Sequence, residues 1–167
     1  MNAPAPARAD ITIRSARLSD AETIAALTKQ LGYDAEPSAV ADRLSRLLAR
    51  SDQQFLVADD GGRSVGWIHI LIAEFVELDA FVVVGGLVVD RDYRKQGIGR
   101  RLLAQAEEWA VQQGCAVVRL SSSATRTDAH EFYRRVGYTN VKTQYSFAKS
   151  VGAAGPDALR AFVPDVT

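Results

Sequence analysis

A strand-to-helix junction at residues 87–103 constrains this chain more than any other segment. The apolar residues 87–89 are typical of a buried strand, and an amphipathic helix follows the turn. Gly97 and Gly99 in the turn let a ligand approach the main chain closely. A helix start leaves backbone N–H groups unpaired and carries partial positive charge, so we expect an anion such as phosphate to bind here.

Basic side chains gather around the same junction. Five of them stand against only two aspartates, Asp90 and Asp92; the five are Arg91, Arg94, Lys95, Arg100 and Arg101. The whole chain carries 20 basic and 20 acidic residues and has no net charge, so this positive charge is local. A polyanionic small molecule is the expected ligand. Nucleic acid is not expected, because its binding needs an extended basic surface.

Spacing excludes two familiar phosphate-binding loops. A Walker loop needs Lys-Ser or Lys-Thr directly after its last glycine, whereas Arg100 follows Gly99. A dinucleotide-binding fingerprint needs a third glycine where this chain has Leu102. The remaining pattern, Arg94-x-x-Gly97-x-Gly99 after Leu-Val-Val, resembles the acetyl-coenzyme A signature of the GNAT superfamily of N-acetyltransferases.

A second segment, at residues 129–138, resembles a later helix of the same family. That helix reads Ala-x-x-Phe-Tyr-x-x-x-Gly followed by an aromatic residue, and here it comes after the glycine turn in the family's order. Phe132 shares a helical face with Ala129, whereas Tyr133 is turned about 100° away from Phe132. Phe132 is therefore predicted to be core, and Gly137 is predicted to end the helix.

The resemblance implies where acetyl-coenzyme A binds. The sheet is expected to splay beside the strand that ends at Val89, with the pantetheine arm in the gap. Main-chain groups of Leu87, Val88 and Val89 would pair with the pantetheine amides, and the Val89 N–H would face the thioester oxygen. The remaining cofactor-binding candidates surround the pyrophosphate; they are Arg94, Lys95, Gln96, Gly97, Ile98, Gly99 and Arg100.

The implied reaction is transfer of acetyl from acetyl-coenzyme A to a primary amine of a small molecule or peptide. The amine attacks directly, without a covalent acyl-enzyme, and Tyr133 is the candidate general acid for the departing thiolate. The alternative is a non-catalytic acyl-coenzyme A sensor on the same fold. Tyr133 favours the enzyme, since binding alone does not need a thiolate acid.

The chain departs from the family pattern at two places. Arg126 stands where many members have an asparagine that contacts the cofactor, and residues 81–84 offer no strand glutamate to act as base. Three acids upstream, Glu74, Glu77 and Asp79, are expected in a loop between strands near the open end of the cleft. They would attract a cationic amine, whose proton is predicted to leave through water with no single indispensable base.

The remaining reactive side chains favour simpler interpretations. Cys115 is the single cysteine, so a disulfide framework is excluded, and its apolar neighbours predict a small buried residue. His69 and His130 are too few and too scattered for a metal cluster. His69 is interpreted as filling a strand, and no metal is expected.

The predicted fold class is α/β (α+β), with a mixed, mainly antiparallel sheet flanked by helices. Residues 10–150 would form one domain between a tail at 1–9 and another at 151–167. Within it, Ser19–Glu22 reads as a capping box, and the expected strands are 11–14, 55–58, 65–72, 81–89, 117–120 and 143–148. No segment resembles a membrane span or a secretion signal, so a cytoplasmic location is expected. A homodimer is compatible with the sequence.

Overall fold

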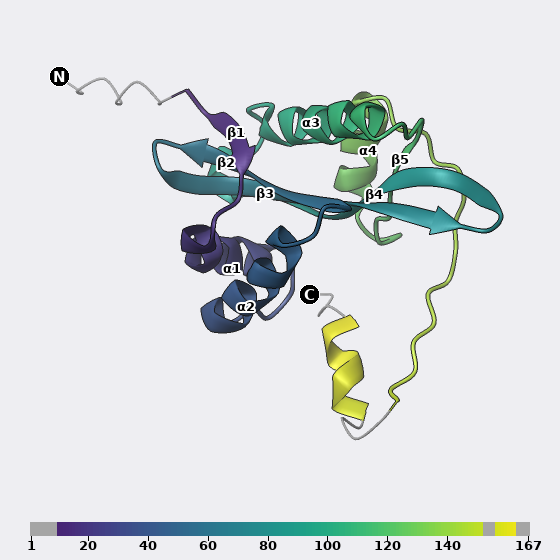
Figure 1. The fold of residues 1–167 in the computed structure, drawn as a ribbon, viewed down its shortest axis with the longest axis horizontal. Coiled ribbons are helices and arrows are strands. Elements are labelled where there is room, and N and C mark those ends of the chain that lie inside the picture. Colours follow the sequence, from purple (N-terminus) through teal and green to yellow (C-terminus); the bar gives the residue numbers. More distant parts are fainter. Residues whose placement is uncertain (1–9, 152–155, 163–167) are drawn as a thin grey trace. The chain divides into compact units, whose positions relative to one another are not determined.

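A computed structural model describes residues 10–151 and 156–162 of the chain (Figure 1). Their contacts form two compact units. One contains the described residues up to 31 together with 35–120, and the other contains 32–34 and the described residues from 121 onwards. The first unit consists of β1 (Thr12–Ser15), the 3-10 turn η1 (Leu18–Asp20), α1 (Ala21–Gln30), α2 (Pro37–Leu48), β2 (Gln53–Asp60), β3 (Arg63–Phe75), β4 (Leu78–Val89), η2 (Arg91–Tyr93), α3 (Ile98–Gln112) and β5 (Val118–Leu120).

The strands of the first unit form one sheet in the order β1-β2-β3-β4-β5. Neighbouring strands are antiparallel except β4 and β5, which are parallel. Figure 1 shows α1 and α2 on one face of this sheet and α3 on the other. The predicted mixed, mainly antiparallel sheet flanked by helices is confirmed.

Apolar periodicity accounts for both layers. On one face, Ile24 and Leu27 of α1 and Leu44 of α2 pack against the apolar side chains Phe55, Val57, Trp67 and Val88 of the sheet. The side chains of α3 that cover the other face are fully or nearly fully buried; they are Ile98, Leu102, Leu103, Ala106, Trp109 and Ala110. Burial of each large apolar side chain contributes about 1.5–3 kcal/mol.

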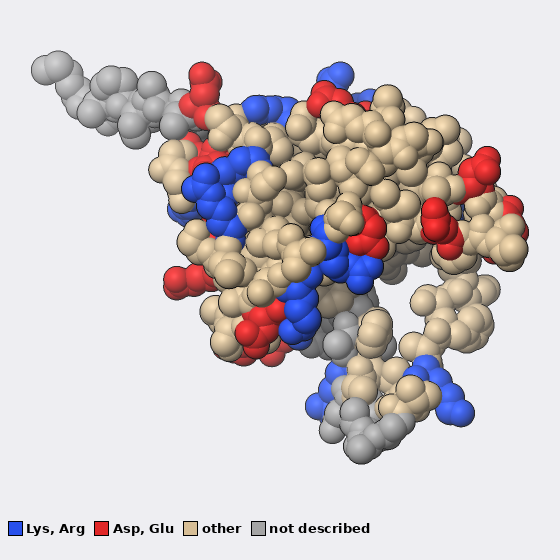
Figure 2. All heavy atoms as spheres, in the orientation of Figure 1, with Lys and Arg blue, Asp and Glu red and all other residues tan. Residues whose placement is uncertain are grey.

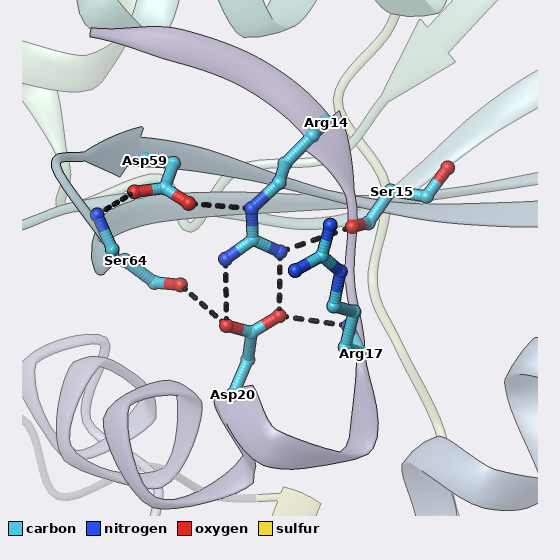
Figure 3. Close-up of polar contacts among 7 residues, drawn as sticks. Arg14, Ser15, Arg17, Asp20, Asp59 and Ser64 are labelled. Atoms are coloured by element: carbon cyan, nitrogen blue, oxygen red, sulfur yellow. Dashed lines mark hydrogen bonds and ion pairs between the residues drawn. The ribbon is translucent and has the colours of Figure 1, made fainter.

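A polar cluster joins β1 to the β2–β3 hairpin and to the start of α1 (Figure 3). The Arg14 guanidinium forms two hydrogen bonds with the Asp20 carboxylate, at 2.8 and 2.9 Å, and a third with Asp59. Asp20 is nearly buried and also accepts from the Arg17 N–H (2.7 Å) and the Ser64 hydroxyl (3.2 Å). The predicted capping box is therefore wrong, because Asp20 precedes α1 and its side chain turns to Arg14 instead.

The Arg14 contact holds the pKa of Asp20 below its ordinary value of 3.8. Its ionised form is thus favoured in the folded state, and the resulting stability is full above about pH 5 and is lost as pH falls below 3.8 toward the folded pKa. We expect Asp20→Asn to lower the free energy of unfolding by about 2 kcal/mol at pH 7. Denaturant unfolding should show the difference from the original protein shrinking in acid.

Asp52→Asn is the matched control, because Asp52 pairs with Arg50 while both side chains are largely exposed. This variant should unfold almost like the original protein. Equal destabilisation by the two variants would contradict a special role for the Arg14–Asp20 cluster.

The second unit contains α4 (Thr127–Arg135) and the 3-10 segment η3 (Pro156–Phe162). Gly137 ends α4 with a φ of 100°, and the Tyr138 N–H donates to the Tyr133 carbonyl at 2.9 Å, so the predicted glycine cap is confirmed. The predicted strand at 143–148 is wrong, since these residues pair with no strand in the described part of the chain, and Tyr145 and Phe147 are over nine-tenths exposed. Alternating side chains alone do not make a strand without a backbone partner.

Candidate functional site

The edge of β4 is open along its last part. β4 pairs with β5 only from Val82 to Val84, where it faces Val118 to Leu120. β5 ends at Leu120, whereas β4 continues through Gly85 to Val89 without a partner on that side among the described residues. The sheet therefore offers a free strand edge immediately before the glycine turn, as expected for a splayed sheet.

Ladder alternation decides which main-chain groups face this open edge. The Asp90 N–H donates to the Val65 carbonyl (2.8 Å), so the next residue bonded to β3 is Val88. Leu87 and Val89 therefore turn their N–H and carbonyl groups toward the open side. The Val89 carbonyl accepts from Arg94 Nε at 3.1 Å, which leaves both groups of Leu87 and the Val89 N–H as candidate ligand contacts. Val88 contributes its side chain to the core instead.

The turn after β4 is held by its own polar contacts. The Asp90 carboxylate accepts from the Asp92 N–H at 3.0 Å, and the Tyr93 hydroxyl donates to the Asp60 carboxylate at 2.8 Å. The Gln96 side chain donates to the Asp92 carbonyl at 3.3 Å. These bonds fix the turn without help from a ligand, which reduces the ordering cost of binding.

Backbone N–H groups at the start of α3 lie beside an unfilled space at Gly97. Lys95 and Gly97 have φ values of 61° and 79°, and α3 begins directly afterwards. The Arg101 N–H donates to the Gly97 carbonyl (3.0 Å), so the three preceding N–H groups, at residues 98–100, have no acceptor within the helix. A Cβ at Gly97 would have no atom within 4 Å. The exposed side chains of Arg94, Lys95 and Arg100 add positive charge to this anion-binding geometry.

Of the three upstream acids, one lies in the expected connection between strands. Glu77 is in the turn, whereas Glu74 belongs to β3 and Asp79 to β4, so the expected loop is confirmed for Glu77 and wrong for the other two. Figure 2 shows acidic side chains gathered at the end of this hairpin. With about 3.4 Å per strand residue, Asp79 lies roughly 27 Å along β4 from Leu87. Salt screens exposed charges beyond about 8 Å, so at this distance we expect Asp79 to contribute little to drawing an amine to Leu87.

Cys115 is buried, with 4% of its surface exposed, and its N–H donates to the Ala110 carbonyl at 2.8 Å. It is the small buried residue that the sequence predicted. Among the described residues, no group of three or more His, Cys, Asp or Glu side chains could hold a metal ion. Within the same part of the chain, none of the helices is long and apolar enough to cross a membrane.

Tyr133 lies on α4 in the second unit and is half-buried. Its ring contacts those of Phe132 and Tyr138, with centroids 5.3 and 6.2 Å apart. Burial raises the pKa of the Tyr133 phenol, and the charge of Arg126 partly offsets this rise. The hydroxyl therefore keeps its proton at neutral pH and can act as a donor. Arg126, which departs from the family pattern, is the charged residue that lowers the pKa of Tyr133 and so offsets part of the effect of burial.

Known proteins are similar to this chain in sequence and in fold. The Acetyltransferase (GNAT) family matches residues 20–138. An aminoalkylphosphonate N-acetyltransferase of Salmonella typhimurium is 30% identical over 141 residues, which are 83% of this chain and 90% of that protein. An aminoglycoside N(6')-acetyltransferase type 1 of Stenotrophomonas maltophilia is 29% identical over 132 residues, covering 76% of this chain and 85% of the relative.

Among solved structures, the aminoglycoside N-acetyltransferase AAC(6')-Iy in complex with CoA superposes with a TM-score of 0.76 at 20% identity, over 88% of this chain and 99% of the other. A GNAT family acetyltransferase of Staphylococcus aureus gives a TM-score of 0.68 at 25% identity, over 84% and 98%. The family match covers both the glycine turn and the tyrosine helix. This chain therefore belongs to the GNAT family of acetyltransferases.

Proposed function

We propose that this protein transfers acetyl from acetyl-coenzyme A to a primary amine by direct attack, within a catalytic domain spanning residues 10–150. The observation that carries the proposal is the open β4 edge at Leu87 and Val89, which leads directly into the N–H groups at the start of α3. An extended amide chain ending in a pyrophosphate matches this order of donors and acceptors. Acetyl-coenzyme A supplies the activated thioester.

Each part of the chain has a distinct role in this proposal. Leu87 and Val89 bind amide groups through their main chain. The Val89 N–H points to the open side, which supports its role as a donor to the thioester oxygen as negative charge grows there, a contribution of a few kcal/mol. Residues 95–100 bind the pyrophosphate, with Arg94 nearby. Burial of Cys115 supports direct attack over an acyl-enzyme.

Tyr133 is the proposed general acid for the leaving thiolate. A phenol near pKa 10 that donates to a thiol near 8.5 is uphill by about 2 kcal/mol for complete transfer. A hydrogen bond that strengthens as the C–S bond breaks avoids most of this cost. Burial raises the pKa of Tyr133, which makes complete transfer still more uphill and favours a hydrogen bond to the leaving thiolate.

The proposed acceptor is the amine of a small molecule. Its class is suggested by the relatives, whose names specify aminoalkylphosphonates and aminoglycosides. We expect thiol release from acetyl-coenzyme A when the protein is given 2-aminoethylphosphonate, kanamycin, spermidine, free amino acids or a peptide with a free N-terminus. At least one amine should accelerate release in a saturable manner.

The same assay distinguishes the enzyme from a non-catalytic acyl-coenzyme A sensor. Calorimetry would measure binding of acetyl-coenzyme A alongside the thiol assay. Saturable binding without thiol release for any amine would identify a sensor and refute the enzyme. Absence of binding would refute both.

A further inference from the structure

A bulge in β4 lies at the point where the strand leaves β5. His69 of β3 faces Gly86 and Ile70 faces Val84, so Gly85 is an extra residue on β4. The β5 pairing stops at the preceding residue, Val84. Gly85 is therefore the first residue of the open edge, next to the main-chain groups proposed to hold the thioester.

Two aromatic side chains of β3 lie directly against this bulge. A Cβ on Gly86 would stand 2.7 Å from two ring atoms of Trp67, and a Cβ on Gly85 would stand 3.1 Å from Nδ1 of His69. Any larger residue at these positions would press on the rings. Gly86 thus leaves room for the indole of Trp67, and Gly85 brings the imidazole of His69 close to the main chain of the open edge.

The contacts of His69 determine which ring nitrogen is free. Nε2 lies 2.7 Å from Oε1 of Gln53, and the ring stacks on Phe55 with a centroid distance of 5.6 Å. An amide oxygen only accepts hydrogen bonds, so Nε2 carries the proton and Nδ1 keeps its lone pair. Nδ1 has no hydrogen-bond partner among the described residues and is the ring nitrogen beside Gly85.

The surroundings of His69 keep the imidazole neutral. Its neighbours on β2 and β4 are uncharged; they are Gln53, Phe55, Gly85 and Gly86. Burial alone lowers the pKa of His69 from its ordinary value of 6.5, and no charged group of α1, α2, β2 or β4 among the described residues contributes. At neutral pH the ring is therefore a base with an available lone pair.

We propose that His69 is the general base of the acetyl transfer and that its Nδ1 takes the proton from the ammonium group of the acceptor. This inference rests on the proposed function. The freed nitrogen lone pair forms the N–C bond as the C–S bond breaks. The nitrogen loses its second proton to solvent once the N–C bond has formed, and His69 also releases its proton to solvent. Tyr133 donates its proton to the thiolate and regains one from solvent, so one proton is released per turnover. With the hairpin acids far from the edge and no carboxylate in residues 81–84, His69 fills the missing role.

The test compares His69→Gln with His130→Gln, a substitution of the other histidine, which lies on α4. The acceptors are the best amine of the panel and an analogue whose amine pKa differs by about two units. The acid limb of the pH profile is the fall of kcat toward low pH. For the original protein and for His130→Gln, the midpoint of this limb should lie below pH 6.5 with both amines. For His69→Gln, kcat at pH 7 should fall at least tenfold, and its limb should follow each amine's own pKa.

Binding of acetyl-coenzyme A should be unchanged in His69→Gln, and the protein should stay folded with a modestly lower melting temperature, because the stack on Phe55 is lost. Gly85→Ala provides a second variant, because its Cβ crowds Nδ1 while the imidazole itself remains. It should lower kcat with little effect on KM for acetyl-coenzyme A. An unchanged rate and limb in a folded His69→Gln protein would overturn the inference while leaving the acetyltransferase proposal intact. A lack of turnover in the original protein would instead refute the proposed function.

Discussion

Gly97→Val is expected to abolish saturable binding of acetyl-coenzyme A. Gly97 precedes α3 with a φ of 79°, and its Cβ position opens into empty space rather than protein. A branched side chain there would stand before the N–H groups at residues 98–100, which have no acceptor within α3, and would oppose the required backbone conformation. Loss of these contacts should weaken binding more than 100-fold, on the scale of charge-assisted hydrogen bonds to a pyrophosphate.

Gly114→Val is the matched control for backbone strain. Gly114 follows the other end of α3 with a φ of 73°, and its Cβ position is also free of contacts within 4 Å. Both variants carry a similar conformational cost, about 1–2 kcal/mol for a left-handed non-glycine residue. Calorimetry should show binding lost in Gly97→Val and kept in Gly114→Val. Where valine prevents folding, the corresponding alanine pair gives the same comparison.

Equal affinity in folded Gly97→Val and Gly114→Val proteins would remove the pyrophosphate site from this turn. Equal loss in both would mean that strain in α3, rather than blocked donors, governs binding. Thermal unfolding of both variants separates this second case from a direct effect.

Tyr133→Phe is expected to lower kcat about 10²-fold or more while leaving affinity for acetyl-coenzyme A nearly unchanged. The ring and its contacts with Phe132 and Tyr138 are retained, so only the hydroxyl is lost. That hydroxyl is needed when the thiolate leaves, which makes its contribution specific to the transition state. Steady-state kinetics with the best amine of the panel, together with calorimetry, would separate kcat from binding.

Cys115→Ala is the comparison variant for a covalent relay. The thiol is buried in the first unit, and we expect turnover within a few-fold of the original protein. An inactive Cys115→Ala protein together with a normal Tyr133→Phe protein would establish an acyl-enzyme route and refute direct attack.

Local chemistry made much of the fold predictable. The helices at residues 21–30, 37–48 and 98–112 follow from apolar side chains at helical spacing, bounded by proline or glycine. The glycine cap of α4 follows from the left-handed conformation that Gly137 adopts without strain. The long apolar run before Asp90 likewise predicts a strand covered on both faces.

The errors of sequence interpretation share one physical cause. Asp20 reads as part of a capping box, but Arg14 on β1 offers it a stronger, charge-assisted partner. Residues 143–148 have the alternation of a strand but no backbone partner in the described chain. The acids near residue 77 are typical of a loop. Cross-strand pairing up to Phe75 and Leu78 nevertheless extends both strands past Glu74 and Asp79. In each case a contact between separate elements, either made or missing, decided the outcome.

The sequence by itself determined the family, the glycine turn and the tyrosine helix, because each depends on residues close together in the chain. Only the tertiary structure decided which main-chain groups of 87–89 face the open edge, since strand register sets their direction. The same register places His69 beside Gly85, sixteen residues further along the chain. Its position against a bulge has no local signal, because a bulge is defined by the strand across from it.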